Sequence, residues 1–138
     1  MRSTITSARF ALVLLLIAPW RVSVGCGVCV EDKVAATYDY RVTENAARQG
    51  HGVAYAEIAG PLAGAAETVA AIQQVVERTH GVIPGSVRLS AAPPAVSFVW
   101  DLAHFDLDPV LSAINSQLEP QQLRLSLLRR WNAKAGMK

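Results

Sequence analysis

The sequence predicts a single α+β domain built on an antiparallel sheet. About half of the 138 residues are apolar (51%), which is enough for one compact core and too little for two. Apolar residues recur at helical spacing in some stretches and alternate with polar residues, as in strands, in others. Strands and helices are interspersed along the chain, which favours one mixed domain.

The first 25 residues have the features of a secretory signal. Arg2 and Arg9 precede or border the apolar run FALVLLLIAPW, and the small residues Ser23 and Gly25 lie three and one positions before Cys26, as a signal-peptidase site prefers. We expect residues 1–25 to be removed and the protein to be periplasmic or secreted. The stretch VSVGC also resembles a lipoprotein box, so acylation of Cys26 is the alternative. An uncleaved anchor is less expected because the run is short for a bilayer.

The charge of the remaining chain argues against a nucleic-acid partner. Without residues 1–25, ten Lys and Arg residues face eleven Asp and Glu residues, whereas nucleic-acid binders normally present a clustered basic face. Only the C-terminal stretch RLSLLRRWNAKAGMK is basic. We expect its last part, residues 132–138, to be a disordered tail.

Residues 26–50 are predicted to form a Cys-x-x-Cys segment followed by one amphipathic helix. From position 30 to position 46 an apolar side chain recurs every fourth residue, and Gly50 ends the pattern. We expect Tyr38 to pack on the sheet and Tyr40 to meet solvent. The apolar positions are Val30, Val34, Tyr38, Val42 and Ala46.

Residues 51–131 are predicted to form the main domain. A strand over 53–58 should place Val53, Tyr55 and Glu57 on one face, and a helix over 62–79 follows it. Two strands in GSVRLSAA and AVSFVWD are joined through a proline pair, and Phe98 and Trp100 of the second are expected in the core. A third helix, capped by Asp108 with Pro109 at its first position, ends near 118. The stretch QLRLSLLRRW alternates as a last strand.

The physical solution for the order strand, helix, strand, strand, helix, strand is a ferredoxin-like βαββαβ sheet with both crossover helices on one face. Together with the leading helix, this gives a ferredoxin-like α+β domain with an additional N-terminal helix. We expect right-handed crossovers to place the first and third strands side by side and parallel. Both strands would then end at one edge, next to the GPLAG loop of residues 60–64.

The segment IAGPLAGAAET and the glycine turn and strand in VVERTHGVIPGSVRLS resemble the heavy-metal-associated (HMA) domain of copper chaperones and metal-pumping ATPases. In that family a Gly-Met-x-Cys-x-x-Cys loop opens the first helix, and its two thiolates bind Cu(I) or another soft ion. Here Gly60 matches the motif glycine and Pro61 replaces the Met. Ala63 and Ala66 stand where the cysteines should be, so the loop's metal ligands cannot be carried over. The resemblance also implies a periplasmic or membrane metal-handling partner.

The candidate metal ligands are Cys26, Cys29 and His104. Two thiolates suit Cu(I), which does not require a tetrahedral set, whereas structural zinc normally takes four N or S ligands. If the leading helix doubles back beside the first strand, the cysteines return to the GPLAG edge, where His104 is also expected. The alternatives are a redox pair at a helix N-terminus and a structural disulfide. His104 is otherwise a loop residue beside a helix cap.

An enzymatic function is not expected. The sequence contains no Ser/His/Asp grouping, phosphate-binding loop or His-Glu-x-x-His motif that would provide a nucleophile or a catalytic metal. The sequence therefore predicts a secreted metal-binding protein that binds or passes a soft ion such as Cu(I). The alternative is a non-catalytic protein-interaction module on a degenerate HMA-like fold with structural cysteines.

Overall fold

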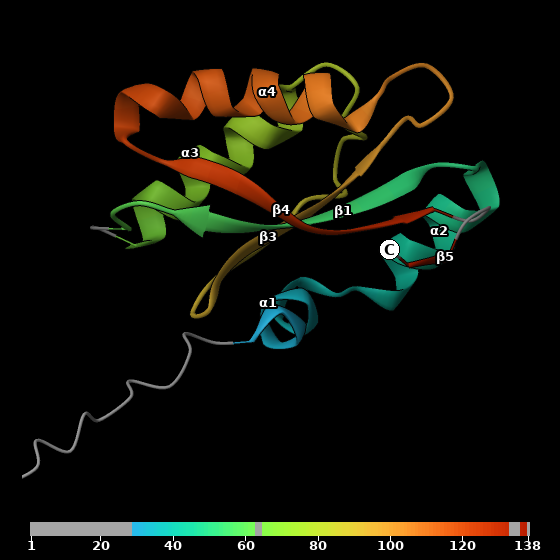
Figure 1. Ribbon diagram of the computed structural model, residues 1–138, viewed down its shortest axis with the longest axis horizontal. Helices are drawn as coiled ribbons and strands as arrows, with labels where there is room; N and C mark the ends of the chain where they lie inside the picture. The colour runs from blue at the N-terminus through green and yellow to red at the C-terminus, as the bar shows by residue number, and fades with distance from the viewer. Residues whose placement is uncertain (1–28, 63–64, 133–135, 138) are drawn as a thin grey trace, which may run out of the picture.

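The computed structural model describes residues 29–62, 65–132 and 136–137 (Figure 1). Its helices are α1 (Val30–Thr37), α2 (Tyr40–Gln49), α3 (Ala65–Arg78) and α4 (Leu107–Leu118), the last followed by a 3-10 turn (Glu119–Gln121). Its strands are β1 (Gly52–Ala59), β2 (Arg88–Ala91), β3 (Pro94–Trp100), β4 (Arg124–Asn132) and the two-residue β5 (Gly136–Met137). The predicted α+β class is confirmed.

The strands form one antiparallel sheet in the order β2-β3-β1-β4-β5. The prediction that the first and third long strands run parallel is wrong, because β1 pairs with β3 in antiparallel register, from Gly52 opposite Trp100 to Glu57 opposite Ala95. A hairpin joins β2 to β3 and reverses the chain before it returns to the centre of the sheet. The end of β3 therefore lies beside the start of β1, away from the loop after β1.

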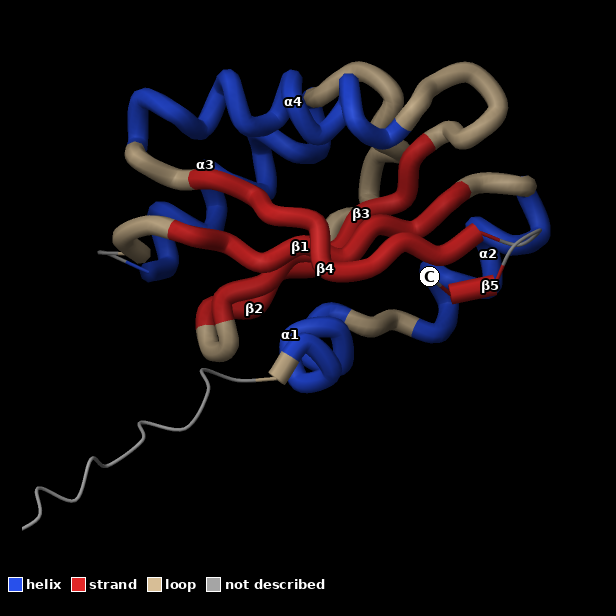
Figure 2. Tube along the Cα trace, viewed as in Figure 1, coloured by secondary structure: helices blue, strands red, loops and turns tan. Residues whose placement is uncertain are grey.

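Helices cover both faces of the sheet (Figure 2), with α3 and α4 on one face and α1 and α2 on the other. The larger apolar core lies under α3 and α4. Ala54, Ala56 and Ile58 of β1 point into it, as do Phe98 and Trp100 of β3, which confirms the alternation predicted for β1 and the core positions predicted for β3. The helices contribute Ile72, Val76, Val110, Ile114 and Leu118.

A smaller apolar cluster lies under α1 and α2. Val53, Tyr55 and Val99 provide its sheet side, and Val34 of α1 and Ala46 of α2 cover them. Val42, Ile83 and Trp131 pack at its margin. The N-terminal helices therefore cover the sheet over this cluster, on the face opposite α3 and α4.

The leading helix is not continuous. It ends at Thr37, and the backbone of Tyr38 is extended (φ −71°, ψ 127°). Asp39 then caps α2, since its carboxylate accepts hydrogen bonds from the backbone N–H groups of Arg41 and Val42 (2.9 and 3.2 Å). Hydrogen bonds from an aspartate side chain to the following backbone N–H groups compete with the hydrogen bonds of a continuous helix, so aspartate favours the start of a helix over its interior. The break leaves Tyr38 49% exposed, so the prediction that it packs on the sheet is wrong.

The third predicted helix begins earlier than expected. Its N-cap is Asp106, not Asp108, and Pro109 is the third residue of α4 instead of the first. Leu107 is buried against the main core, which explains the earlier start: the first residue of the helix already contributes to the core. The end at Leu118 agrees with the prediction.

The C-terminal segment also differs from expectation where it is described. Asn132 belongs to β4, and it pairs with Gly136 while Trp131 pairs with Met137, so these positions of the expected disordered tail 132–138 form β-structure. The predicted signal segment 1–25, Cys26 and Ala63 lie outside the described residues. Within the described part of the chain, no helix is both long and apolar enough to cross a membrane.

Candidate functional site

Cys29 lies immediately before the first helix. Its carbonyl oxygen accepts hydrogen bonds from the backbone N–H groups of Asp32 and Lys33 (3.0 and 3.2 Å), which fixes the backbone at the start of α1. Its side chain makes no capping hydrogen bond and is exposed as a free cysteine among the described residues. Cys26, the other half of the motif, lies outside them. The thiol of Cys29 is thus accessible at a helix N-terminus, as the sequence predicts.

The helix that follows Cys29 is attached to the sheet by two ion pairs. The Nζ of Lys33 lies 2.6 Å from Oε2 of Glu57 on β1. On β4, Arg129 donates two hydrogen bonds to the carboxylate of Glu31, at 2.6 and 3.0 Å. A bidentate guanidinium–carboxylate pair restricts orientation as well as distance. These contacts place the first turn of α1 over β1 and β4.

His104 lies in a different group of polar side chains. Its Nδ1 is 2.7 Å from Oδ2 of Asp101, and Nδ1 of His51 is 3.8 Å from the other oxygen of that carboxylate. The hydrogen bond to His104 is the main cause that lowers the pKa of Asp101 below its ordinary value of 3.8. His104 itself is 73% exposed. These three side chains lie where β3 ends and β1 begins.

The predicted convergence of His104 with the GPLAG loop is wrong, because antiparallel pairing of β1 and β3 puts them at opposite ends of β1. His51, which the sequence analysis did not count as a candidate, is the residue that His104 approaches through Asp101. In the described part of the chain, no three His, Cys, Asp or Glu side chains are arranged to hold a metal ion. The structure therefore does not assemble Cys29 and His104 into one ligand set.

The loop after β1 has a glycine turn and presents few polar side chains. Gly60 has a φ of +118°, and a Cβ there would lie 2.3 Å from the carbonyl oxygen of Gln122, so this position requires glycine. Pro61 is exposed, and Leu62 packs against the main core. Ala66 is exposed in the first turn of α3. The described part of this loop offers no replacement for the family's thiolates.

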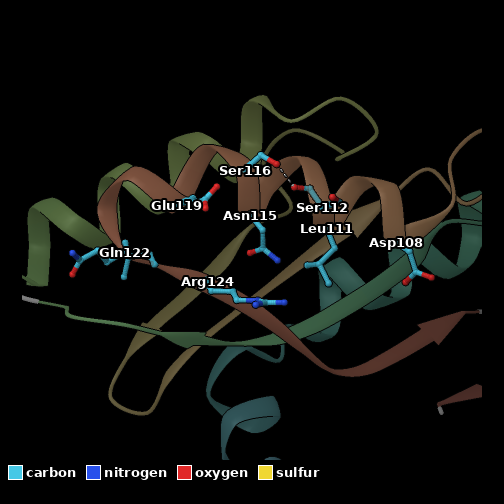
Figure 3. A pocket seen from close by; sticks show the side chains of 9 residues that line it. Asp108, Leu111, Ser112, Asn115, Ser116, Glu119, Gln122 and Arg124 are labelled. Carbon is cyan, nitrogen blue, oxygen red and sulfur yellow. Dashed lines mark hydrogen bonds between the residues drawn. The ribbon is translucent and has the colours of Figure 1, made fainter.

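An open groove of about 560 Å³ lies between α4 and β4, and the sequence analysis missed it (Figure 3). The side chain of Asn115 projects from α4 toward β4, where its amide donates to the carbonyl of Leu125 (3.0 Å) and its oxygen accepts from the N–H of Leu125 (2.7 Å). An asparagine inside a helix is the sequence signal that could have indicated this contact. The groove is lined by Asp108, Leu111, Ser112, Asn115, Ser116, Glu119, Gln122, Leu123 and Arg124.

No family model, no curated protein and no solved structure matches this chain. The functional argument therefore depends on the chain's own residues.

Proposed function

We propose that this protein is a secreted, non-catalytic metal-binding protein in which Cys26 and Cys29 hold a soft ion such as Cu(I), on a ferredoxin-like fold related to the heavy-metal-associated domain. The observation that carries the proposal is the exposed thiol of Cys29 next to α1, which has no disulfide partner among the described residues. Two thiolates separated by two residues form a sufficient set for Cu(I). His104 is not part of the proposed set, because it lies with Asp101 and His51.

The placement of α1 supports this proposal. Its ion pairs to Glu57 and Arg129 and the buried side chain of Val34 hold the helix on the sheet. The strand order β2-β3-β1-β4 supports the ferredoxin-like fold. A periplasmic or membrane metal-handling partner remains part of the proposal through the family resemblance.

The test is a Cu(I) titration of the chain without residues 1–25, under reducing anaerobic conditions and against a competing chelator. One tight equivalent is expected, and the double variant Cys26→Ser, Cys29→Ser should lose it, since serine offers no soft ligand. His104→Ala is the matched control and should retain full binding. Binding that is equal in the wild type and the double serine variant would contradict the proposal, and loss of binding in His104→Ala would contradict the two-thiolate set.

A second candidate function is a non-catalytic protein-interaction module in which the cysteines are structural. The specific observation that favours it is the outer edge of β4, where part of the strand has no neighbouring strand within the described part of the chain. In this reading Cys26 and Cys29 form a disulfide in the oxidising compartment. Mass measurement of the protein purified without reductant distinguishes the two states, because a disulfide leaves no thiol for alkylation and offers no thiolate to a metal.

A further inference from the structure

The outer edge of β4 is open over a short window, residues 126–130. β1 pairs with the inner edge of β4 from Arg124 to Asn132, with a β-bulge that leaves Leu128 without a partner on β1, whereas β5 pairs only with Trp131 and Asn132. At the other end, the side chain of Asn115 satisfies both backbone groups of Leu125. Among the described residues no strand lies beside the window. An edge with unpaired N–H and C=O groups is a template for a further strand.

The backbone of Leu127 provides the donor and acceptor in this window. Peptide groups alternate between the two edges of a strand, and those of Leu125 point outward to Asn115. Those of Leu127, two residues further, therefore point outward as well. Its side chain is 37% exposed. The window thus combines hydrogen-bonding groups with an apolar contact, which is how strand addition obtains both affinity and register.

The groove beside the window gives room for the side chains of an added strand. Figure 3 shows α4 as one wall and the start of β4 as the other, with Leu111 and Asn115 between them. Its volume of about 560 Å³ is within the range of small binding pockets. A strand placed along β4 would direct alternate side chains toward this groove.

The positive charge of β4 favours an added strand that carries acidic residues. The nine residues of β4, RLSLLRRWN, include three arginines and no acidic residue. Arg124 and Arg130 are exposed, and neither has a carboxylate partner among the described residues. They lie near the two ends of the window. Their partners on β1, Ala59 and Ala54, are five positions apart because of the bulge, so the two arginines are about 17 Å apart along the sheet at about 3.3 Å per residue and belong by register to opposite faces of it. Opposite charges across a strand pair are stabilising and like charges are destabilising.

A second copy of this chain is a poor occupant for the same reason. Antiparallel pairing of two β4 strands would bring the three arginines of each copy beside those of the other, with no acidic residue in either strand. We propose that the β4 edge binds an extended segment of a partner protein that carries acidic residues, paired antiparallel to residues 126–130 with its carboxylates on Arg124 and Arg130. The inference extends the interaction-module alternative and does not depend on metal binding.

The test uses a fluorescein-labelled nine-residue peptide, Thr-Glu-Val-Thr-Val-Thr-Glu-Val-Thr, whose two glutamates are five positions apart, as are the β1 partners of Arg124 and Arg130. Fluorescence anisotropy should show binding that weakens with salt, and a peptide with lysine in both glutamate positions should bind about ten-fold more weakly. Methylation of the peptide nitrogens on one edge should abolish binding, because it removes the donors for β4. Cys26→Ser, Cys29→Ser should bind equally well, which keeps this result separate from the metal test.

Charge reversal locates the site. Arg124→Glu, Arg130→Glu should reverse the preference to the lysine peptide, and both positions are exposed, so the fold should be retained by circular dichroism. Arg41→Glu, Arg78→Glu makes the same change of net charge on exposed residues of α2 and α3 and should bind like the wild type. Equal binding of both peptides, no preference change on reversal, or a β4-mediated dimer in sedimentation would overturn the proposal.

Discussion

The two faces of the sheet are covered by different kinds of contact. Under α3 and α4 the contact is a continuous apolar core that includes Phe98, Trp100 and Ile114. Under α1 and α2 the apolar cluster is smaller, centred on Tyr55 and Val34, and polar contacts surround it. Burial of apolar area is the main stabilising contribution in folding. The difference indicates that α3 and α4 belong to the folding core. In contrast, α1 and α2 are attached to a sheet whose opposite face is already packed against α3 and α4.

The polar contacts of the second face are distributed along α1 and the break that follows it. The hydroxyl of Ser97 on β3 donates to the carbonyl of Thr37 (2.7 Å), which satisfies a backbone acceptor at the end of α1. Beyond the break, Nε of Arg88 on β2 donates to Oδ2 of Asp39 (2.8 Å). The Arg88–Asp39 pair fixes the position of the segment more than it adds stability, because ion pairs near the surface contribute about 0–1 kcal/mol.

The largest expected contrast comes from the same substitution made on each face. Val96 and Val99 both lie on β3, Val96 in the main core and Val99 in the smaller cluster. Val96→Ala should lower the free energy of unfolding by about 2–3 kcal/mol and Val99→Ala by about 1–2 kcal/mol, since the cost grows with the cavity that the surroundings cannot fill. Urea denaturation of both variants measures the difference. Equal losses would mean that both faces are equally part of the core.

A smaller effect is expected at the ion pair that attaches α1 to β1. Lys33→Met should lower stability by about 0.5–1 kcal/mol, and Glu57→Gln by a similar amount, because both side chains are only partly exposed and the pair is only partly screened. The double variant should lose less stability than the sum of the losses in the two single variants. Hydrogen exchange of the α1 amides should accelerate while that of α4 is unchanged; acceleration in both helices would show that α1 does not open separately.

The smallest effect is expected at Asp39, and it should depend on pH. The hydrogen bond from Arg88, followed by those from the backbone N–H groups of Val42 and Arg41, lowers the pKa of this carboxyl below 3.8. A group with a lowered folded-state pKa stabilises the protein above its unfolded pKa and loses that contribution as the pH falls through the folded pKa. Asp39→Asn, which still caps a helix, should therefore be less stable than the wild type at neutral pH.

The measurement is the stability difference between wild type and Asp39→Asn in denaturant titrations from neutral pH downward. The difference should shrink as the pH falls below the ordinary value of 3.8. Arg88→Gln should behave in the same direction, since it removes the other half of the pair. A difference that stays constant over the whole range would show that the charge of Asp39 has no part in the attachment.

The sequence was enough to predict the fold class and which side chains of β1 lie on which face of the sheet. The alternation along β1 shows this because both faces of the strand are buried. The direction of β3 relative to β1 was predicted wrongly although the connections determine it: a hairpin after a right-handed crossover must return antiparallel. The break at Tyr38 was missed because a four-residue apolar repeat continues through it. Asp39 between two tyrosines, a strong capping residue, was the local signal.

The candidate site was less predictable than the fold. The position of Cys29 before a helix follows from local sequence alone, and the structure has it there. The location of His104 depended on strand direction and was therefore wrong. The open edge of β4 could not be predicted, since it exists only once β1, Asn115 and β5 have taken their places along the strand.

The tryptophans of the described chain are divided between the two faces. Trp100 is buried in the core under α3 and α4, and Trp131 packs at the margin of the cluster under α1 and α2. In the chain without residues 1–25, variants that retain only one of the two would give separate fluorescence signals for the two layers. Detachment of the N-terminal helices could then be followed optically, in the intact protein and in real time, without any added label.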